Sequence, residues 1–235
     1  MILACICARG GSRGVSGKNM RMLAGYPLLH YAIRCAMLTA SIDDIVVSSD
    51  NDDILKLAGD TGVRNIYRRS SHLATDTTSK WFVWKDLVQR YEKYNAVEID
   101  YLVDLDVTAP LRKPHHVEAC VKEAIQNNRE VVITGYPSDR NPYFNMMEPD
   151  LDGYWSLVAQ SSEPIVCRQD APKVVSLSPA VYVCSRDALY SHQHWSNAKC
   201  TLVEIEKMNA IDIDTEIDFN FVEFLVENNI SELVS

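Results

Sequence analysis

Several features that would place a protein in a particular class are missing from this sequence of 235 residues. It has no long hydrophobic run: the first apolar stretch, residues 2–8, ends in arginine and glycine, which argues against a membrane span or a signal peptide. It has no Cys-x-x-Cys pair, and seven cysteines, an odd number, favour reduced thiols in a core over disulfides or structural zinc. A general excess of positive charge is also missing, because the net charge is −9. These absences indicate a cytoplasmic protein that binds neither nucleic acid nor membrane.

Acidic residues are missing from the first part of the chain. Residues 1–42 contain no Asp or Glu, and their cations are Arg9, Arg13, Lys18, Arg21 and Arg34. Within this part, an apolar run at 2–7 breaks into a stretch at 9–21 that mixes four glycines with four cations. Such a loop after a buried strand is typical of an anion-binding site, because glycine lets backbone N–H groups approach an oxyanion. The alternative, an ordinary solvent-exposed turn, does not require four cations without an acid.

The glycine-rich loop matches neither common phosphate motif. A Walker A loop would need Gly at Ser12 and Ser or Thr at Asn19, and a dinucleotide fingerprint would need Gly at Ser12 and Val15. A P-loop phosphotransferase is therefore disfavoured. The other end of the chain has the opposite charge, with nine acids and a single Lys in residues 204–232. A carboxylate pair there could hold a divalent cation.

Strands and helices are predicted to alternate over residues 1–136. The predicted strands are 2–7, 45–48, 63–67, 101–106 and 130–134, and the predicted helices are 27–37, 51–62, 81–95 and 114–128. This alternation predicts an α/β protein with a doubly wound, largely parallel sheet, in which ligands bind beyond the carboxyl ends of the strands.

The alternation of strands and helices stops at residues 137–172. Prolines and an Asp-Gly pair there predict short antiparallel ribbons, interpreted as a flap or a dimer arm. Three further elements are predicted at 180–184 (strand), 186–192 (helix) and 201–206 (strand). A closing helix at 216–228 is predicted to carry apolar residues on one face, namely Ile217, Phe221, Phe224 and Leu225. We expect residues 1–235 to form a single domain, because this length suits one full core.

Five stretches, in order, resemble one family. The opening loop, 8–14 followed by 17–21, is similar to the signature of the cytidylyltransferases that activate sialic acid and its relatives, the CMP-nonulosonate synthetases. The later stretches that agree are 69–77, 108–112, 180–182 and 212–218. Three segments look more like the legionaminate branch of this family than the neuraminate branch: 105–112, 140–145 and 168–173.

The resemblance implies a three-layer, Rossmann-like nucleotidyltransferase fold with a mixed, mostly parallel sheet and a protruding arm at 137–172 that forms a homodimer. It also implies that CMP is transferred from CTP to the anomeric hydroxyl of a nonulosonic acid, with Mg²⁺ as cofactor and pyrophosphate as product. A Kdo-type eight-carbon acceptor is the nearest alternative. A non-catalytic nucleotide-binding module is another, but Lys18, Asp212 and Asp214 argue against it.

The resemblance also assigns residues. The implied nucleotide site is Ala8, Arg9, Gly10, Gly11, Ser12, Lys18, Asn19, Arg69 and Lys80, in which Arg9 and Lys18 are catalytic and act on the phosphates. The implied sugar site is Asp106, Arg112, Arg140, Arg168 and Gln169. Asp212 and Asp214 correspond to the magnesium ligands; they share one face if extended, although Asp212 could instead cap the following helix.

Three positions depart from the neuraminate enzymes. Asp106 replaces a sugar-contacting glutamine, Lys80 replaces a small hydroxyl residue, and Ser178-Pro179 replaces Asn-Gly. These departures leave the sugar open. An acid at position 106 would repel a ligand carboxylate, but it could also accept hydrogen bonds from hydroxyl or acylamino groups or join the metal shell.

Other polar and aromatic clusters have simpler interpretations. His192, His194 and Cys200 lack a fourth ligand, so we expect surface histidines rather than a metal site. His115-His116 follows Pro114 and is expected to start a helix. An aromatic series on the helix at 81–95 is expected to pack in the core rather than stack on bases: Trp81, Trp84, Tyr91 and Tyr94.

Overall fold

The protein is described by a computed structural model that covers residues 1–11, 15 and 17–234. Across this part of the chain, the main sheet has seven strands: β1 (Ile2–Cys7), β4 (Asp44–Ser49), β5 (Asn65–Arg68), β6 (Tyr101–Asp104), β7 (Val131–Pro137), β10 (Val175–Ser185) and β11 (Cys200–Glu204). Their order in space is β11-β7-β10-β6-β1-β4-β5.

The sheet is mixed and mostly parallel, as predicted. β10 pairs antiparallel with both β6 and β7, and the other neighbouring pairs are parallel. The chain runs from β1 through β4 to β5 on one side and then returns to place β6 on the other side of β1. The strand order therefore reverses at β1, and a crevice at the carboxyl ends of β1 and β6 is the expected ligand site.

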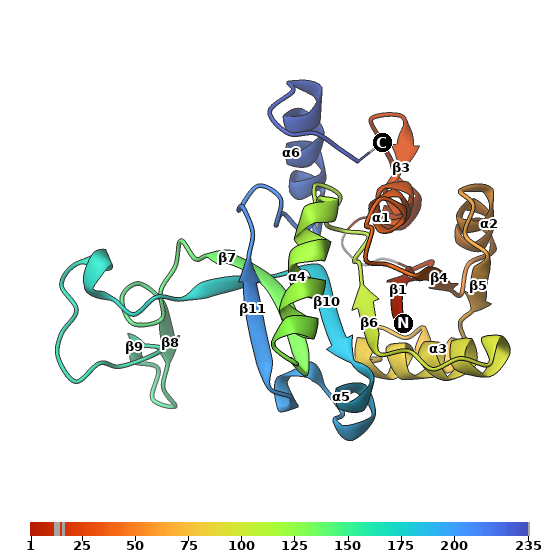
Figure 1. Cartoon of the computed structure of the whole chain (residues 1–235). Coiled ribbons are helices and arrows are strands. Elements are labelled where there is room, and N and C mark those ends of the chain that lie inside the picture. Colours follow the sequence, from red (N-terminus) through yellow and green to blue (C-terminus); the bar gives the residue numbers. More distant parts are fainter. Residues whose placement is uncertain (12–14, 16, 235) are drawn as a thin grey trace.

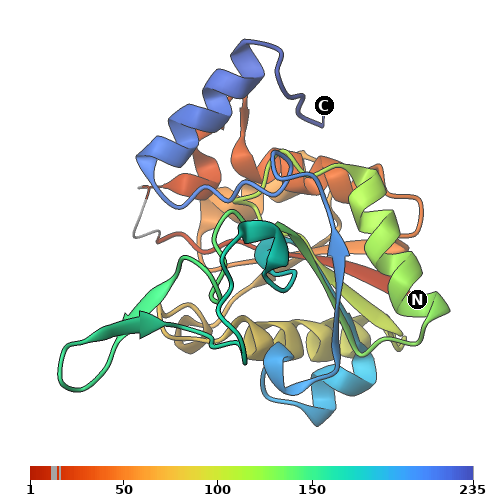
Figure 2. The same ribbon diagram turned by 90° about the vertical axis from the view of Figure 1, so that its left-hand side faces the viewer.

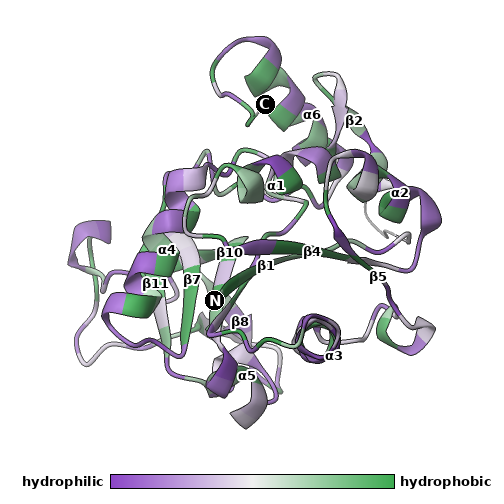
Figure 3. Ribbon diagram, turned by 45° about the vertical axis from the view of Figure 1, so that its right-hand side comes forward, coloured by the Kyte–Doolittle hydropathy of each residue, from purple (hydrophilic) through white to green (hydrophobic). Residues whose placement is uncertain are grey.

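Helices cover both faces of the sheet (Figure 1). One layer contains α1 (Leu28–Met37), α2 (Asp52–Asp60), α4 (Pro114–Gln126) and α6 (Glu216–Glu227), and the other contains α3 (Lys80–Asn95) and α5 (Arg186–Ser191). Alternate residues of β1 enter the two cores: Ala4 and Ile6 face the first layer, while Leu3 and Cys5 face the second. Figure 3 shows the apolar strands between the two helical layers. The predicted three-layer fold is confirmed.

Local sequence explains several element ends. Asn51 caps α2, because its side chain accepts hydrogen bonds from the backbone N–H groups of Asp53 and Ile54. Thr215 and Asp218 form a capping box at the start of α6. α4 starts at Pro114, as expected, and the His116 ring accepts from the backbone N–H of Lys113 there.

Some predicted ranges differ from the structure. β6 ends at Asp104, two residues before the predicted end, while β7 and β10 extend beyond their predicted ranges because they pair with each other as far as Pro137 and Val175. The hairpin of β2 (Met22–Leu23) and β3 (Tyr26–Pro27) was not predicted.

Of the four residues predicted for the apolar face of α6, only Leu225 is buried. Ile217, Phe221 and Phe224 are 78%, 50% and 52% exposed, and the buried side is formed by Phe219, Val222 and Leu225. The prediction was wrong because α6 is apolar on more than one side, so the helical period fits two different stripes. By contrast, Trp81, Trp84 and Tyr91 on α3 are buried as expected, and only Tyr94 of that series is exposed.

Residues 137–172 leave the body of the sheet as an arm (Figure 1, and from another side Figure 2). The arm contains an antiparallel hairpin of β8 (Met147–Pro149) and β9 (Trp155–Leu157). Both strands of this hairpin are exposed along their whole length.

Two absences expected from the sequence concern membrane spans and disulfides. Within residues 1–11, 15 and 17–234, no helix combines the length and the apolar character needed to cross a membrane. The cysteines carry free thiols: Cys5, Cys35, Cys120 and Cys184 are buried, Cys7 is half-buried, and Cys167 and Cys200 are exposed.

Candidate active site

A cleft opens at the carboxyl ends of the parallel strands, where the strand order reverses. It is lined by residues from the loop after β1, the segment from β5 to the start of α3, the loop after β6 and the segment before α6. It brings together eight of the residues assigned by resemblance: Arg9, Lys18, Asn19, Arg69, Lys80, Asp106, Asp212 and Asp214. These come from four distant parts of the sequence, so the fold creates the site.

The loop after β1 is held against the neighbouring strand. The Ala8 backbone N–H donates to the Ser48 carbonyl at 3.1 Å, and the Gly10 N–H donates to Asp50 Oδ1 at 2.8 Å. A Cβ at Gly10 would lie 2.9 Å from the Asn51 Cβ, so this close approach requires glycine. Gly11 is exposed, and Ser12 lies outside the described residues.

Asn19 and Arg9 shape the wall of the cleft. Asn19 is buried and its Nδ2 donates to the Arg9 carbonyl at 2.9 Å, which fixes the loop backbone. The Arg9 guanidinium forms an ion pair with Asp76. Because both side chains are about one-third exposed, a triphosphate could reach Arg9 from the solvent side.

Lys18 lies beside the late acidic residues. Its side chain is 12% exposed, its Nζ donates to the Ile213 carbonyl, and Nζ lies 3.3 Å from Asp214 Oδ1. A cation from the first segment and carboxylates from the last are therefore adjacent, although 196 residues separate them. This is the arrangement that an anionic ligand and its metal would need.

Asp212 and Asp214 fit a divalent cation. Asp212 Oδ1 is buried and has no hydrogen-bond partner among the described residues. Burial chiefly, with the charges of Asp106 and Asp214, raises the pKa of Asp212 to about 6. A buried carboxylate oxygen without a donor is unfavourable unless a cation contacts it, and carboxylate oxygens are the ligands that Mg²⁺ takes.

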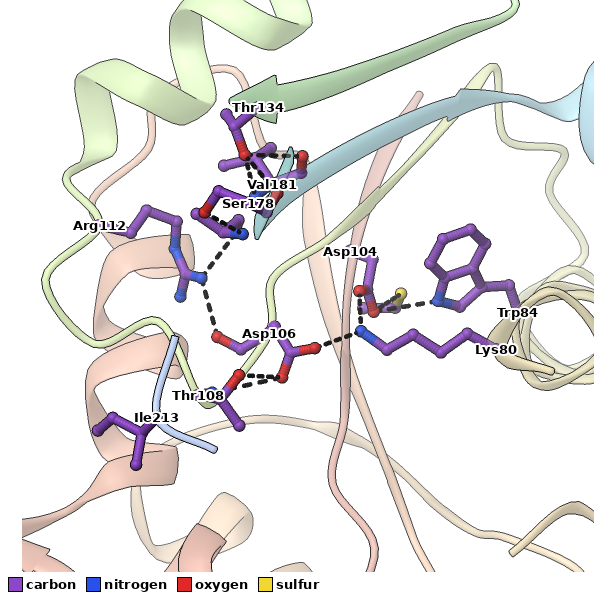
Figure 4. Close-up of polar contacts among 12 residues, drawn as sticks. Lys80, Trp84, Asp104, Asp106, Thr108, Arg112, Thr134, Ser178, Val181 and Ile213 are labelled. Carbon is purple, nitrogen blue, oxygen red and sulfur yellow. Dashed lines mark hydrogen bonds and ion pairs between the residues drawn. The ribbon is translucent and has the colours of Figure 1, made fainter. Parts of the chain in front are cut away.

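Arg69 and Lys80, from the segment that runs from β5 to the start of α3, form another part of the cleft wall. Arg69 is 7% exposed and its guanidinium donates to the carbonyl of Ser48 at 2.9 Å. Lys80 Nζ lies between two carboxylates, 2.6 Å from Asp104 Oδ2 and 2.7 Å from Asp106 Oδ2 (Figure 4). The Lys80 ammonium thus pairs with Asp106, the residue whose role the sequence left open, and with Asp104 at the same time.

Arg112 and Ser178 are buried near the cleft and bond to backbone carbonyls. Arg112 is 1% exposed, and its Nη1 donates to the carbonyls of Asp106 and Ala180 at 2.9 and 2.7 Å. Ser178 is buried and its Oγ donates to the Ala210 carbonyl at 3.0 Å. Neither side chain lines the cleft, so this geometry favours a positioning role for both rather than direct sugar contact.

The three remaining residues assigned to the sugar are on the arm. Arg140, Arg168 and Gln169 are exposed, and none of them lines the cleft of this chain. Arg168 Nη2 donates to the backbone carbonyl of Asp139, within the arm itself. Their assignment therefore requires a second chain.

The two histidine clusters of the sequence differ in the part of the chain that the structure covers. His192, His194 and Cys200 do not converge. His115, His116 and Glu206 do converge, but His116 accepts from the Lys113 N–H through Nδ1, so its Nε2 carries the proton that bonds Glu206. This contact ties α4 to the segment that follows β11.

Sequence reasoning missed several residues of the cleft, including Cys7, Asp76 and Thr78, and also Asp104 just behind it. Asp76 and Thr108 lay within stretches that carried the resemblance but were given no role. Asp104 had a usable signal, because a lone acid in an apolar strand must find a partner in the core.

A strand order that reverses at β1, with cations and carboxylates meeting across the crevice there, is typical of the ligand site of a doubly wound α/β protein. The chain belongs to the cytidylyltransferase family, whose model matches residues 3–229. It is therefore a nucleotidyltransferase.

Two relatives and one solved structure illustrate the similarity. Post-translational flagellin modification protein B of Campylobacter coli is 36% identical over 226 residues, which cover 96% of this chain and 95% of the relative. CMP-N,N'-diacetyllegionaminic acid synthase of Campylobacter jejuni is 34% identical, covering 96% and 94%. The structure of CMP:2-keto-3-deoxy-manno-octonic acid synthetase complexed with CTP matches with a TM-score of 0.71 and 17% identity, covering 97% and 99%, and supports the fold.

Proposed function

We propose that this protein transfers CMP from CTP to the anomeric hydroxyl of a nonulosonic acid of the legionaminate type, with Mg²⁺ as cofactor. The observation that carries the proposal is the contact of Lys18 with Asp214, beside Asp212, in a cleft that also contains Arg9. The similarity to a CMP-N,N'-diacetyllegionaminic acid synthase supports this acceptor class. We expect the reaction to take place in the cytoplasm.

The reaction is a displacement at the α-phosphorus. The anomeric hydroxyl oxygen forms the new P–O bond and loses its proton to water, the bond to the bridging oxygen of the β-phosphate breaks, and pyrophosphate leaves. Lys18, held by the Ile213 carbonyl, places its ammonium where negative charge develops, which stabilises the transition state. Arg9 orients the triphosphate.

Asp212 and Asp214 would hold the cation that neutralises the phosphates and raises the electrophilicity of phosphorus. The buried side chains of Asn19 and Arg112 keep the two loops of the cleft in position, because they bond to the backbone carbonyls of Arg9 and Asp106. The protein's contribution is therefore chiefly positioning and charge neutralisation.

Pyrophosphate release tests this chemistry. Purified protein with CTP, Mg²⁺ and a nonulosonic acid should release pyrophosphate, and EDTA should abolish the release. Pyrophosphate release that persists in EDTA, or equal rates with UTP and CTP, would contradict a magnesium-dependent cytidylyltransferase.

We also propose that the protein is a homodimer in which the arm of each chain reaches the neighbouring cleft. The arm exposes several large apolar side chains, among them Met147, Leu151, Tyr154, Trp155 and Val166. Burial of these side chains against another chain would be favourable. Arg140 and Arg168 suit a carboxylate because the guanidinium fork binds both of its oxygens.

A complementation experiment tests this assembly. Lys18→Ala and Arg168→Ala chains should each be nearly inactive alone. After they are unfolded together and refolded, about a quarter of the wild-type sites should be restored, because random pairing makes half of the dimers mixed and each mixed dimer has one intact cleft. No recovery in mixtures, or a fully active monomer in sedimentation, would refute the shared site. Tyr94→Ser, an exposed aromatic substitution on α3, serves as a control that leaves assembly unchanged.

A further inference from the structure

A buried carboxylate lies directly behind the cleft. Asp104 ends β6, and its side chain is 1% exposed. Its Oδ1 accepts hydrogen bonds from Trp84 Nε1 at 3.0 Å and from Cys5 Sγ at 3.4 Å, while Oδ2 accepts from Lys80 Nζ (Figure 4). Because Trp84 and Cys5 belong to a helix and a strand of the core, Asp104 has a fixed orientation and fixes the Lys80 ammonium in turn.

Lys80 joins this buried carboxylate to Asp106, which faces the cleft. Burial lowers the pKa of Lys80, but the two carboxylates outweigh it and raise that pKa well above its ordinary value. Asp106 Oδ1 accepts from the backbone N–H and the hydroxyl of Thr108 at 3.3 and 3.2 Å, so its position is fixed as well. The pair therefore presents an ammonium and a carboxylate in a set geometry.

The hydrogen-bond donors of Lys80 and acceptors of Asp106 that remain unused show what this pair can bind. Within the described residues, two of the three Lys80 N–H donors are taken by Asp104 and Asp106, which leaves one for a ligand. Asp106 Oδ2 accepts from Lys80 and can accept one further bond. Lys80 and Asp106 are 37% and 20% exposed, and both line the cleft. A hydroxyl group matches this pair, because one oxygen can accept from the ammonium and donate to the carboxylate.

The charges lead to the same conclusion. The proposed ligands are both anions, and an uncompensated Asp106 beside Asp212 and Asp214 would repel them. With Lys80 in contact, the charge of Asp106 is paired inside the cleft, and the second carboxylate that shares this ammonium, Asp104, is 1% exposed behind the cleft. A carboxylate can then serve as a hydrogen-bond acceptor in a site that must bind anions.

We propose that Lys80 and Asp106 act as one ion-paired unit that binds a sugar hydroxyl of the substrates, and that Asp104 is the positioning residue that fixes this unit. This inference rests on the proposed function and deepens it. The hydroxyl belongs either to the ribose of CTP or to the acceptor sugar, since both offer the same chemistry.

A double-mutant cycle tests the coupling. In the wild-type chain, Lys80→Met would leave the buried Asp104 without a counterion, so the cycle is run in the Asp104→Asn background. There, Lys80→Met and Asp106→Asn should each lower kcat/KM by about 10-fold or more, and the two changes together should cost no more than Lys80→Met alone, because both remove the same contact. If the losses in kcat/KM of the two single variants multiply in the double variant, Lys80 and Asp106 act independently and the proposal is wrong. Lys85→Met is the matched control, because Lys85 is on the same helix but donates to the His192 carbonyl outside the cleft.

Deoxy substrates test the hydroxyl and identify its source. Removing the bound hydroxyl, from the ribose as 2'- or 3'-deoxy-CTP or from the acceptor as a deoxy acid, should cost about 10-fold in kcat/KM with the wild-type protein. That cost should disappear in Asp106→Asn and shrink in Asp104→Asn, a change that a merely structural role would not produce. If every deoxy substrate suffers the same cost in all variants, the proposal is wrong. Calorimetry measures the binding of CTP and deoxy-CTP without turnover, and it therefore separates the hydroxyl contact from the proposed transferase reaction. A wild-type protein that binds CTP more tightly than deoxy-CTP but shows no turnover would refute only the transferase reaction.

Discussion

Replacement of Lys18 by alanine is expected to lower kcat by about 10²-fold or more, with a much smaller change in the KM for CTP. The Lys18 ammonium is held by the Ile213 carbonyl and lies 3.3 Å from Asp214, so it is already oriented before substrate binds. A group oriented in this way acts mostly on charge that develops in the transition state. Steady-state kinetics with CTP as the varied substrate gives both constants.

Lys122→Ala, an exposed change on α4, is the matched control for Lys18 and should leave both constants near wild type. Circular dichroism should show the same fold for the two variants. A Lys18→Ala enzyme with wild-type kcat and only a raised KM would show that Lys18 is a passive phosphate contact.

Asp212→Asn is expected to reduce kcat by about 10²- to 10³-fold, because a lost metal contact removes several kcal/mol of transition-state stabilisation. The buried, unpartnered Oδ1 of Asp212 is the reason to place the cation there. A second readout does not depend on turnover: Mg²⁺ should raise the melting temperature of the wild-type protein and should raise that of Asp212→Asn much less.

Asp152→Asn, an exposed change in the arm, controls for the loss of one negative charge. Should Mg²⁺ stabilise Asp212→Asn and wild type equally, the cation binds elsewhere and the assignment of Asp212 is wrong.

Much of the fold could be predicted because local sequence determines it. Short continuous apolar runs located the strands of the parallel half of the sheet, and Asn51 marked the start of α2. The length of β10 could not be predicted, since its first half pairs with β7 beyond the range that its own sequence favours. The buried side of α6 was missed because Ile217, Phe221 and Phe224 form an equally regular apolar stripe that remains exposed.

The candidate site was predictable to the extent that each residue type indicates its chemistry. A cationic glycine loop and a late acidic pair are typical of phosphate and metal binding, and Lys18 and Asp214 do meet. The partnership of Lys80 with Asp104 and Asp106 was not predictable, because it joins a helix start to a strand end and the loop after it, 24 and 26 residues away. The structure explains how an acid at position 106 can be tolerated: its charge is paired.

The most direct test of the proposed function is a comparison of kcat/KM for four acceptors with CTP and Mg²⁺: legionaminate, pseudaminate, neuraminate and Kdo. We expect legionaminate to be preferred, with neuraminate and Kdo each lower by about 10²-fold or more, because two mismatched polar contacts cost about 1–3 kcal/mol each. The CMP-sugar should form in equal amount to the pyrophosphate released. Preference for Kdo or neuraminate would contradict the acceptor assignment, and failure to convert any sugar acid would contradict the proposed reaction itself.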